Sequence, residues 1–201
     1  GILPKYRGTL CHDHWKAYYG YDQCVHSLCN AHHIRELERA REQDGQNWAK
    51  NMKVFLEEIN IIVQEAGGAL SEEEAKKQKK RYRNILTRGE KECPENEKEI
   101  GKRGKQKQSK SRNLLNRLRD FEDDVLRFMT DKNVSFTNNL GENDIRMTKV
   151  QQKISGCFRS MDGAKTFCRV RSYLITARKN GICPSKAISM LFKGKLPAFI
   201  T

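Results

Sequence analysis

Two stretches of the chain repeat apolar residues at intervals of three and four, which is the spacing of one face of a helix. The first runs from Trp48 to Ala66 and stops at Gly67-Gly68, and the second runs from Leu114 to Phe128. Each predicts a long amphipathic helix with a buried stripe. We expect the two stripes to pack against each other.

The N-terminal part changes from a strand pattern to a helix pattern. Short β-branched or apolar runs predict two strands, over residues 9–13 and 25–29, with a short helix or loop at 15–19 between them. After the second strand, Asn30 is expected to cap a helix that ends at Asp44-Gly45.

The C-terminal part is predicted to contain one extended segment and two helices. The extended segment covers residues 150–160. A helix from 163 to 180 ends at Gly181, and a short helix from Pro184 to Phe192 follows it. We expect the first of these helices to be buried through Ala164, Phe167, Val170, Leu174 and Ala177.

Residues 71–112 have few apolar positions and many charges, so this part is predicted to bury little. A solvated helix and a loop around 93–94 and 101–104 fit the pattern. The end of the segment is basic without one acid, through Lys102, Arg103, Lys105, Lys107, Lys110 and Arg112. Such a run either contacts nucleic-acid phosphates or is a charged linker.

Composition adds a partner to this picture. The 201 residues hold 39 Lys and Arg against 25 Asp and Glu, a formal charge of +14, which favours a polyanion such as DNA. A 37% hydrophobic content can supply a core. No apolar run is long enough to cross a membrane, and the absence of a signal sequence indicates a cytosolic protein or a piece of a longer one. Seven cysteines, an odd number, favour reduced thiols over a disulfide framework.

Two acids stand where a metal-dependent nuclease would place them. Asp13 ends the first predicted strand, and Glu142 begins a helix after Asn138 and Asn139, which are expected to cap or orient that helix. Phosphodiester chemistry of this type needs divalent metals held by carboxylates on rigid elements. Spacing alone selects these two only weakly from 25 acidic residues.

Ordered motifs sharpen the assignment. The chain resembles bacterial insertion-sequence transposases of the sixty-six family through residues 13–18 (Asp-His-Trp-Lys-Ala-Tyr), 29–32 (Cys-Asn-Ala-His), 138–142 (Asn-Asn-Leu-Gly-Glu) and 156–160 (Gly-Cys-Phe-Arg-Ser). The family has Ala and then Glu-Arg where this chain has Gly141 and then Glu142-Asn143. A basic side chain beside the glutamate is therefore lost.

The resemblance implies an α/β, ribonuclease H-like catalytic domain with an Asp-Asp-Glu triad, in which Asp13 is the second aspartate and Glu142 the glutamate. It implies Mg²⁺ or Mn²⁺ as the metal, and DNA cleavage and strand transfer as the reaction. The first aspartate would lie upstream of this sequence, so we expect the chain alone to be inactive. The expected parts are a partial core over 1–45, a helical lysine-rich insertion over 46–130, and the rest of the core over 131–201.

The same resemblance implies partners and supporting residues. DNA is expected at the element ends and at the target, with a homo-oligomer as the form of the full-length protein and the bacterial cytoplasm, in association with the nucleoid, as the location. The predicted phosphate contacts are Arg146, Lys149 and Lys153, to which the basic run adds Lys102, Arg103 and Lys105, and Cys29 and His32 have predicted structural roles.

A second interpretation remains open. Histidines and cysteines cluster near the N-terminus, so Cys24, Cys29, His32 and one further residue could form a tetrahedral zinc site. The spacing is not that of a standard finger, and we expect reduced core cysteines instead. The alternative function is a non-catalytic basic nucleic-acid-binding module, which such a zinc site could stabilise.

Overall fold

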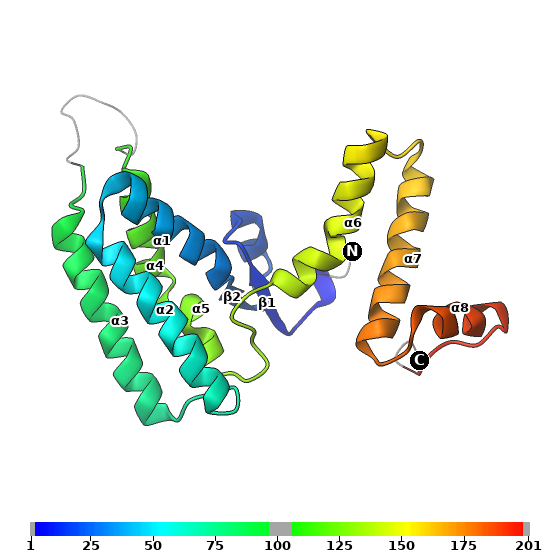
Figure 1. Ribbon diagram of the computed structural model, residues 1–201, viewed down its shortest axis with the longest axis horizontal. Helices are drawn as coiled ribbons and strands as arrows, with labels where there is room; N and C mark the ends of the chain where they lie inside the picture. Colours follow the sequence, from blue (N-terminus) through cyan, green and yellow to red (C-terminus); the bar gives the residue numbers. More distant parts are fainter. Residues whose placement is uncertain (1–2, 97–105, 199–201) are drawn as a thin grey trace. The chain divides into compact units, whose positions relative to one another are not determined.

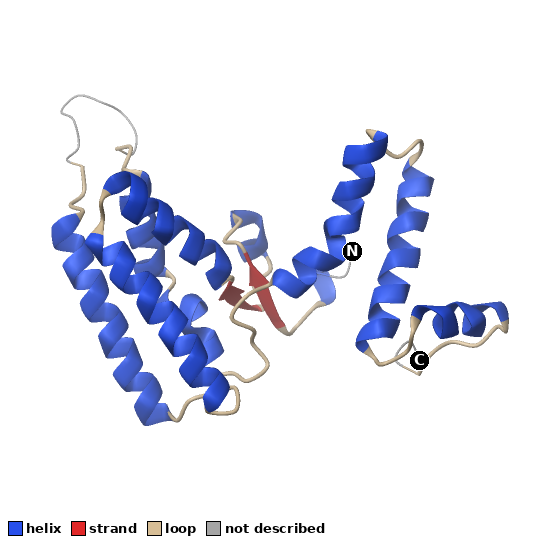
Figure 2. Cartoon of the chain, viewed as in Figure 1, coloured by secondary structure: helices blue, strands red, loops and turns tan. Residues whose placement is uncertain are grey.

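The computed structural model describes residues 3–96 and 106–198, and the chain divides into two compact units, 1–138 and 139–201. The first unit combines two short strands with a group of packed helices, and the second is made of helices (Figures 1 and 2). The predicted α/β class is met in part, because the described chain is mostly helical and has two strands. None of its helices has the length and apolar character that crossing a membrane requires.

The strands are β1 (Thr9–His12) and β2 (Val25–Leu28), and they pair in parallel with Thr9 opposite Val25. A short 3₁₀ helix, η1 (Leu3–Lys5), precedes β1, and a second, η2 (Lys16–Gly20), lies between the strands. The predicted strand–helix–strand order is confirmed to within one residue at each strand end. Parallel strands point their carboxyl ends to one edge, so the segment that leaves β1 lies beside the segment that leaves β2.

Helices α1 (Asn30–Asp44), α2 (Asn47–Glu65) and α3 (Glu72–Glu92) pack in sequence, α1 on α2 and α2 on α3. The predicted apolar stripe of α2 is confirmed, since Trp48, Phe55 and Ile59 are at most 1% exposed. The helix predicted from Asn30 is also present, but Cys29 occupies the N-cap position and Asn30 is the first helical residue. Gly45, with φ of 67°, ends α1 as expected.

The prediction that the lysine-rich segment buries little is wrong for α3. Its few apolar residues recur at helical spacing, so one face enters the core through Ala75, Tyr82, Ile85 and Leu86. The Tyr82 hydroxyl donates to the carbonyl of Leu118 at 2.7 Å. Ser71 caps the helix by accepting from the N–H of Glu74. The composition did not indicate this core face, because exposed charged residues outnumber the apolar residues that form it.

The helix predicted over 114–128 is broken into three pieces: α4 (Lys110–Asp120), α5 (Glu122–Leu126) and the 3₁₀ turn η3 (Arg127–Met129). The last turn of α4 contains two arginines, and the first turn of α5 contains three acidic residues, which suits the dipoles of one helix that ends and another that begins. The apolar spacing runs through the break and so concealed it. The main packing partners of α4 are α1 and α3, whereas of the three pieces η3 makes the main contact with α2, so the expected packing of one stripe on the other is met chiefly through η3.

Arg112 lies inside the first unit, which corrects its inclusion among phosphate-contacting residues. Its side chain is 3% exposed and pairs with Glu90 at 2.5 Å and with Glu95 at 3.0 Å. Its Nη1 also donates to the carbonyl of Cys93 at 2.8 Å. A guanidinium with these partners holds the start of α4 against the end of α3. It is not available to a nucleic acid.

The second unit consists of α6 (Asn139–Ser155), α7 (Met161–Lys179) and α8 (Pro184–Phe192). The extended segment predicted over 150–160 is wrong up to Ser155, because α6 continues until Gly156 turns the chain at φ of 73°. The predicted helices over 163–180 and 184–192 are confirmed. Of the five residues expected to be buried in the first of them, Ala177 alone is buried, and Val170 is 51% exposed. Periodicity identifies the apolar face of a helix but does not say what covers it.

Candidate active site

Asp13 follows the last residue of β1 and its side chain is exposed. The backbone N–H of Trp15 donates to Asp13 Oδ1 at 3.2 Å, and within the described chain no cation pairs with this carboxylate. The backbone N–H of His14 donates to His12 Nδ1 at 3.2 Å, and His14 has a positive φ of 70°. The turn is therefore tied to β1 by a side chain and presents a carboxylate with one oxygen uncommitted. We call residues 13–16 the ledge.

The segment behind the ledge is attached to the helices by one carboxylate. Asp124, on α5, accepts from the Tyr19 hydroxyl at 3.0 Å and from Arg127 Nη2 at 3.1 Å. Arg127 in turn donates through Nε to the carbonyl of His26, on β2, at 2.6 Å. Asp124 and Arg127 thus link η2, β2 and α5. Burial, followed by the charge of Asp124, raises the pKa of Tyr19, so its hydroxyl remains a donor.

A histidine pair lies beneath the ledge. His12 is 2% exposed, and its Nε2 lies 3.1 Å from His26 Nδ1. Burial, reinforced by the charges of His26 and His14, lowers the pKa of His12 to about 4, so the ring is neutral near pH 7. Because His12 Nδ1 accepts from the His14 N–H, the single ring proton is on Nε2 and is donated to His26. The pair fixes one tautomer directly next to Asp13.

The first turn of α1 is held from three directions by Asn30. Its Nδ2 donates to the carbonyl of Val125 at 3.0 Å, its Oδ1 lies 3.0 Å from His33 Nδ1, and its backbone N–H donates to the carbonyl of Phe136. Burial lowers the pKa of His33 to about 3, so His33 is neutral and its Nδ1–H is the donor. The structure therefore uses Asn30 as a clamp between α1 and α5, and not as the predicted cap.

The predicted zinc set is not brought together. The Cys24 thiol donates to the carbonyl of Tyr6 at 3.2 Å, while the Cys29 sulfur accepts from the backbone N–H of Asn138 at 3.3 Å. Cys29 Sγ and a ring nitrogen of His32 lie within 4.8 Å of each other, but Cys24 is not part of that group. The position of Cys24 therefore contradicts the hypothesis of a zinc site built from Cys24, Cys29 and His32.

Glu142 lies in the first turn of α6, where its negative charge suits the helix dipole. Asn139 is the first residue of α6, and Asn138 precedes it with a buried Oδ1 that makes no hydrogen bond within the described chain. The predicted cap by the Asn138 side chain is therefore not formed through this oxygen. The convergence of Glu142 with Asp13 stays a prediction.

The predicted phosphate contacts on α6 share one face. Arg146, Lys149 and Lys153 are exposed and follow one another at three and four residues, which aligns them along the helix. Three other predicted contacts, Lys102, Arg103 and Lys105, lie outside the described residues.

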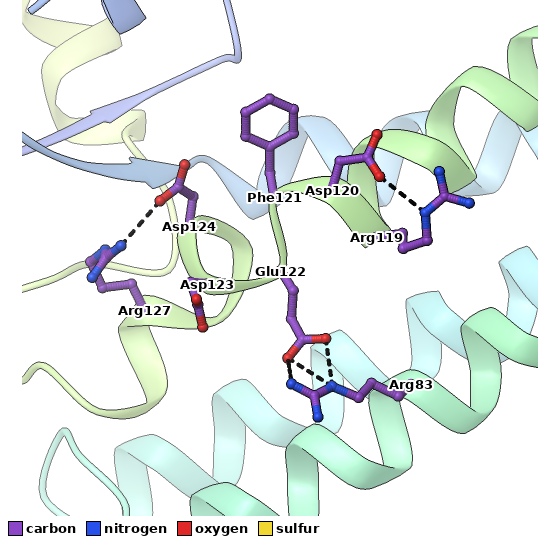
Figure 3. Close-up of a pocket in the computed structure, with 8 residues that line it drawn as sticks. All are labelled: Arg83, Arg119, Asp120, Phe121, Glu122, Asp123, Asp124 and Arg127. Atoms are coloured by element: carbon purple, nitrogen blue, oxygen red, sulfur yellow. Dashed lines mark hydrogen bonds and ion pairs between the residues drawn. The ribbon is translucent and has the colours of Figure 1, made fainter. Parts of the chain in front are cut away.

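A hollow of about 520 Å³ at the junction of α4 and α5 is lined by several acids and is the main competitor for a cation (Figure 3). Its carboxylates are already paired: Glu122 with Arg83 at 2.7 Å, Asp120 with Arg119 at 3.0 Å and Asp123 with Lys79 at 2.7 Å. Asp124 is engaged as described above. These pairs neutralise the hollow, so it stabilises the helix junction and offers no unpaired carboxylate comparable with Asp13.

Sequence reasoning missed the residues that support the ledge, namely His12, His26, Asp124 and Arg127. The three-residue spacing of Asp124 and Arg127 was a weak signal for an ion pair within one helical turn. Nothing in the sequence indicated that this pair would contact strands a hundred residues away.

A model described as the transposase IS66 family matches residues 1–166. The match includes both Asp13 and Glu142 and extends into α7. No curated protein and no solved structure matches the chain.

Proposed function

The chain belongs to the transposase IS66 family, and from this premise we propose that Asp13 and Glu142 are two of the carboxylates that hold divalent metal for DNA cleavage and strand transfer. Membership of the family connects the chain with DNA transposition. The metal, the reaction and the residues are our proposal, as are the ribonuclease H-like core and the homo-oligomeric working form.

One observation carries the proposal. Asp13 is an exposed carboxylate at the carboxyl end of a parallel strand, fixed by the Trp15 N–H on one oxygen and by the His12–His14 hydrogen bond behind it. Rigid strand ends are where a fold can hold a ligand in place. The acids of the α4–α5 hollow lack this property because each is bound to a protein cation or a hydroxyl.

The donor set fits Mg²⁺ or Mn²⁺, which prefer oxygen ligands and keep open coordination positions. When bound, two such ions activate the attacking oxygen and stabilise the leaving oxygen of a phosphodiester. The residues of this chain have the remaining tasks. The hydrogen-bonded His12–His26 pair supports the ledge, and Arg146, Lys149 and Lys153 form a stripe that suits a row of phosphates.

Metal-directed cleavage of the backbone tests the location of the metal in this chain directly. Fe²⁺ takes oxygen sites of this kind, and with ascorbate and peroxide it produces hydroxyl radicals that cut the protein beside the bound ion. We expect a cut in the ledge near Asp13, suppressed by excess Mg²⁺ and abolished by Asp13→Asn. Fragment masses measure it.

The exposed Asp22, in the turn before β2, provides a matched control, and Asp22→Asn should leave the cut unchanged. Cutting within residues 120–124 would instead assign the metal to the acidic hollow. Cutting that persists in Asp13→Asn would remove Asp13 from the metal site.

The stripe on α6 predicts a particular salt dependence. If Arg146, Lys149 and Lys153 each contact a phosphate of duplex DNA, replacing all three by Gln should reduce the slope of log affinity against log salt by up to about 2.7, at about 0.9 per contact. Fluorescence anisotropy titrations across a salt series measure that slope.

The charge-matched control replaces Lys50, Lys80 and Lys91, which are exposed and make no ion pair within the described chain. This triple variant should change the slope by less than the value for one phosphate contact, about 0.9. Equal effects of the two variants would mean that net charge, and not the α6 stripe, controls binding.

A further inference from the structure

The chain has two tryptophans in opposite environments. Trp48 is 1% exposed in the core between α2 and α3, whereas Trp15 is 63% exposed on the ledge. A tryptophan is usually largely buried, because its ring removes a large apolar area from water. An indole held in solvent two residues from Asp13 therefore needs an explanation other than core packing.

Trp15 is exposed but not loosely attached. Its backbone N–H is bonded to Asp13 Oδ1, and its ring meets that of Tyr18 at 5.4 Å and 85°. The Tyr18 ring lies 5.0 Å from the ring of buried His12. The indole is thus braced through Tyr18 to the histidine that also fixes the Asp13 turn, so carboxylate and indole are held as one piece.

The neighbours of Trp15 favour a nucleic-acid ligand over a protein surface. Asp13 and Lys16 are exposed within two residues of it, so the indole has charged side chains on both sides along the chain. Lys16 directly follows Trp15 and can meet a phosphate while the ring meets a base. Ring and cation at neighbouring positions are the features with which proteins bind single strands.

We propose that Trp15 is a stacking site for an unpaired nucleobase of the DNA, with Lys16 on the adjoining phosphate. The ligand class is single-stranded DNA or an unpaired base at a DNA end, because the faces of bases inside a duplex are already stacked. The inference rests on the proposed function in that it names the substrate state bound beside Asp13. A base on Trp15 places its own backbone next to the carboxylate.

The two tryptophans make the proposal measurable by fluorescence. Stacked bases quench indole emission, and Trp48 is shielded, so a single-stranded oligothymidine should quench only the Trp15 part of the emission. Trp15→Ala should weaken binding of the single strand roughly 5- to 100-fold, while affinity for a duplex of equal length changes less than twofold. Trp15→Phe should restore much of the affinity because it keeps a ring.

Several outcomes would overturn the stacking site. Unchanged single-strand affinity in Trp15→Ala is one, and equal loss of single-strand and duplex affinity is another. A blue shift of Trp15 emission that depends on protein concentration without DNA would assign the ring to contacts between copies. Retained Trp48 emission reports that each variant is folded.

The metal site is tested separately from the stacking site. Asp13→Asn should retain quenching even though it loses the Fe²⁺-directed cut. Quenching by the oligonucleotide with no cut at the ledge would leave Trp15 as a base-stacking site and reject Asp13 as a metal ligand, and the reverse pattern would reject Trp15 alone.

Discussion

Replacing Asp13 by Asn, or Glu142 by Gln, is expected to reduce Mg²⁺-dependent strand transfer by at least about 10³-fold in the transposase that carries these residues, a loss of about 4 kcal/mol in transition-state stabilisation. Each change keeps the size of the side chain but replaces the negative charge by a carboxamide, which holds a divalent cation poorly. Binding of DNA should change less than threefold, since phosphates are held by lysine and arginine. Strand-transfer assays with labelled element ends, together with mobility shifts, measure both quantities.

Matched controls separate loss of charge from loss of a ligand. Asp22→Asn removes an exposed carboxylate from the first unit, and Asp162→Asn removes one from the first turn of α7. Both should transfer strands at close to the normal rate. Normal turnover by Asp13→Asn or by Glu142→Gln would remove that residue from the catalytic set.

Arg112→Met is expected to lower the free energy of unfolding by about 2 to 4 kcal/mol, one of the largest effects available to a charged residue in this chain. The buried guanidinium binds Glu90, Glu95 and the carbonyl of Cys93, and Met fills a similar volume without replacing these bonds. The two glutamates are partly exposed and can rehydrate, which keeps the estimate below that for a fully buried pair. Urea denaturation followed by circular dichroism measures the difference.

Lys110→Gln is the control for Arg112→Met, since Lys110 is exposed in the first turn of α4 and makes no ion pair within the described chain. It should change the free energy of unfolding by less than about 0.5 kcal/mol. The salt slope of DNA binding should be the same for Arg112→Met as for the unchanged chain. A stable Arg112→Met variant with a smaller salt slope would show that Arg112 contacts a phosphate.

Sequence patterns predicted the local elements well where one physical signal dominated. The α2 stripe, the two strands around η2 and the Gly181 stop each follow from spacing or from glycine conformation. The break at Phe121 could not be predicted from apolar spacing, because that spacing continues through it, and the sequence signal there is the charges that suit a helix end and a helix start. The core face of α3 was missed because the overall composition of the segment is dominated by lysines, which conceals six buried positions.

The candidate site was predicted in part for a similar reason. Motif order selected Asp13 and Glu142 as candidates whose role stays a prediction, and the family assignment is confirmed. The supporting contacts of the ledge were not predictable, because Asp124 lies 105 positions from Tyr19 and Arg127 lies 101 positions from His26. Such pairings arise from the tertiary fold, and local sequence propensity does not predict them.

These long separations also govern when the ledge can form during synthesis. A contact between positions 19 and 124 closes a long loop, which makes it slow and late compared with the neighbouring helix contacts. At roughly 5 to 20 residues per second, the ribosome needs about 5 to 20 s after adding Tyr19 before Asp124 exists. The β1–β2 segment must wait through that interval without its anchor. The nascent chain therefore carries Asp13 well before it can hold that carboxylate in place.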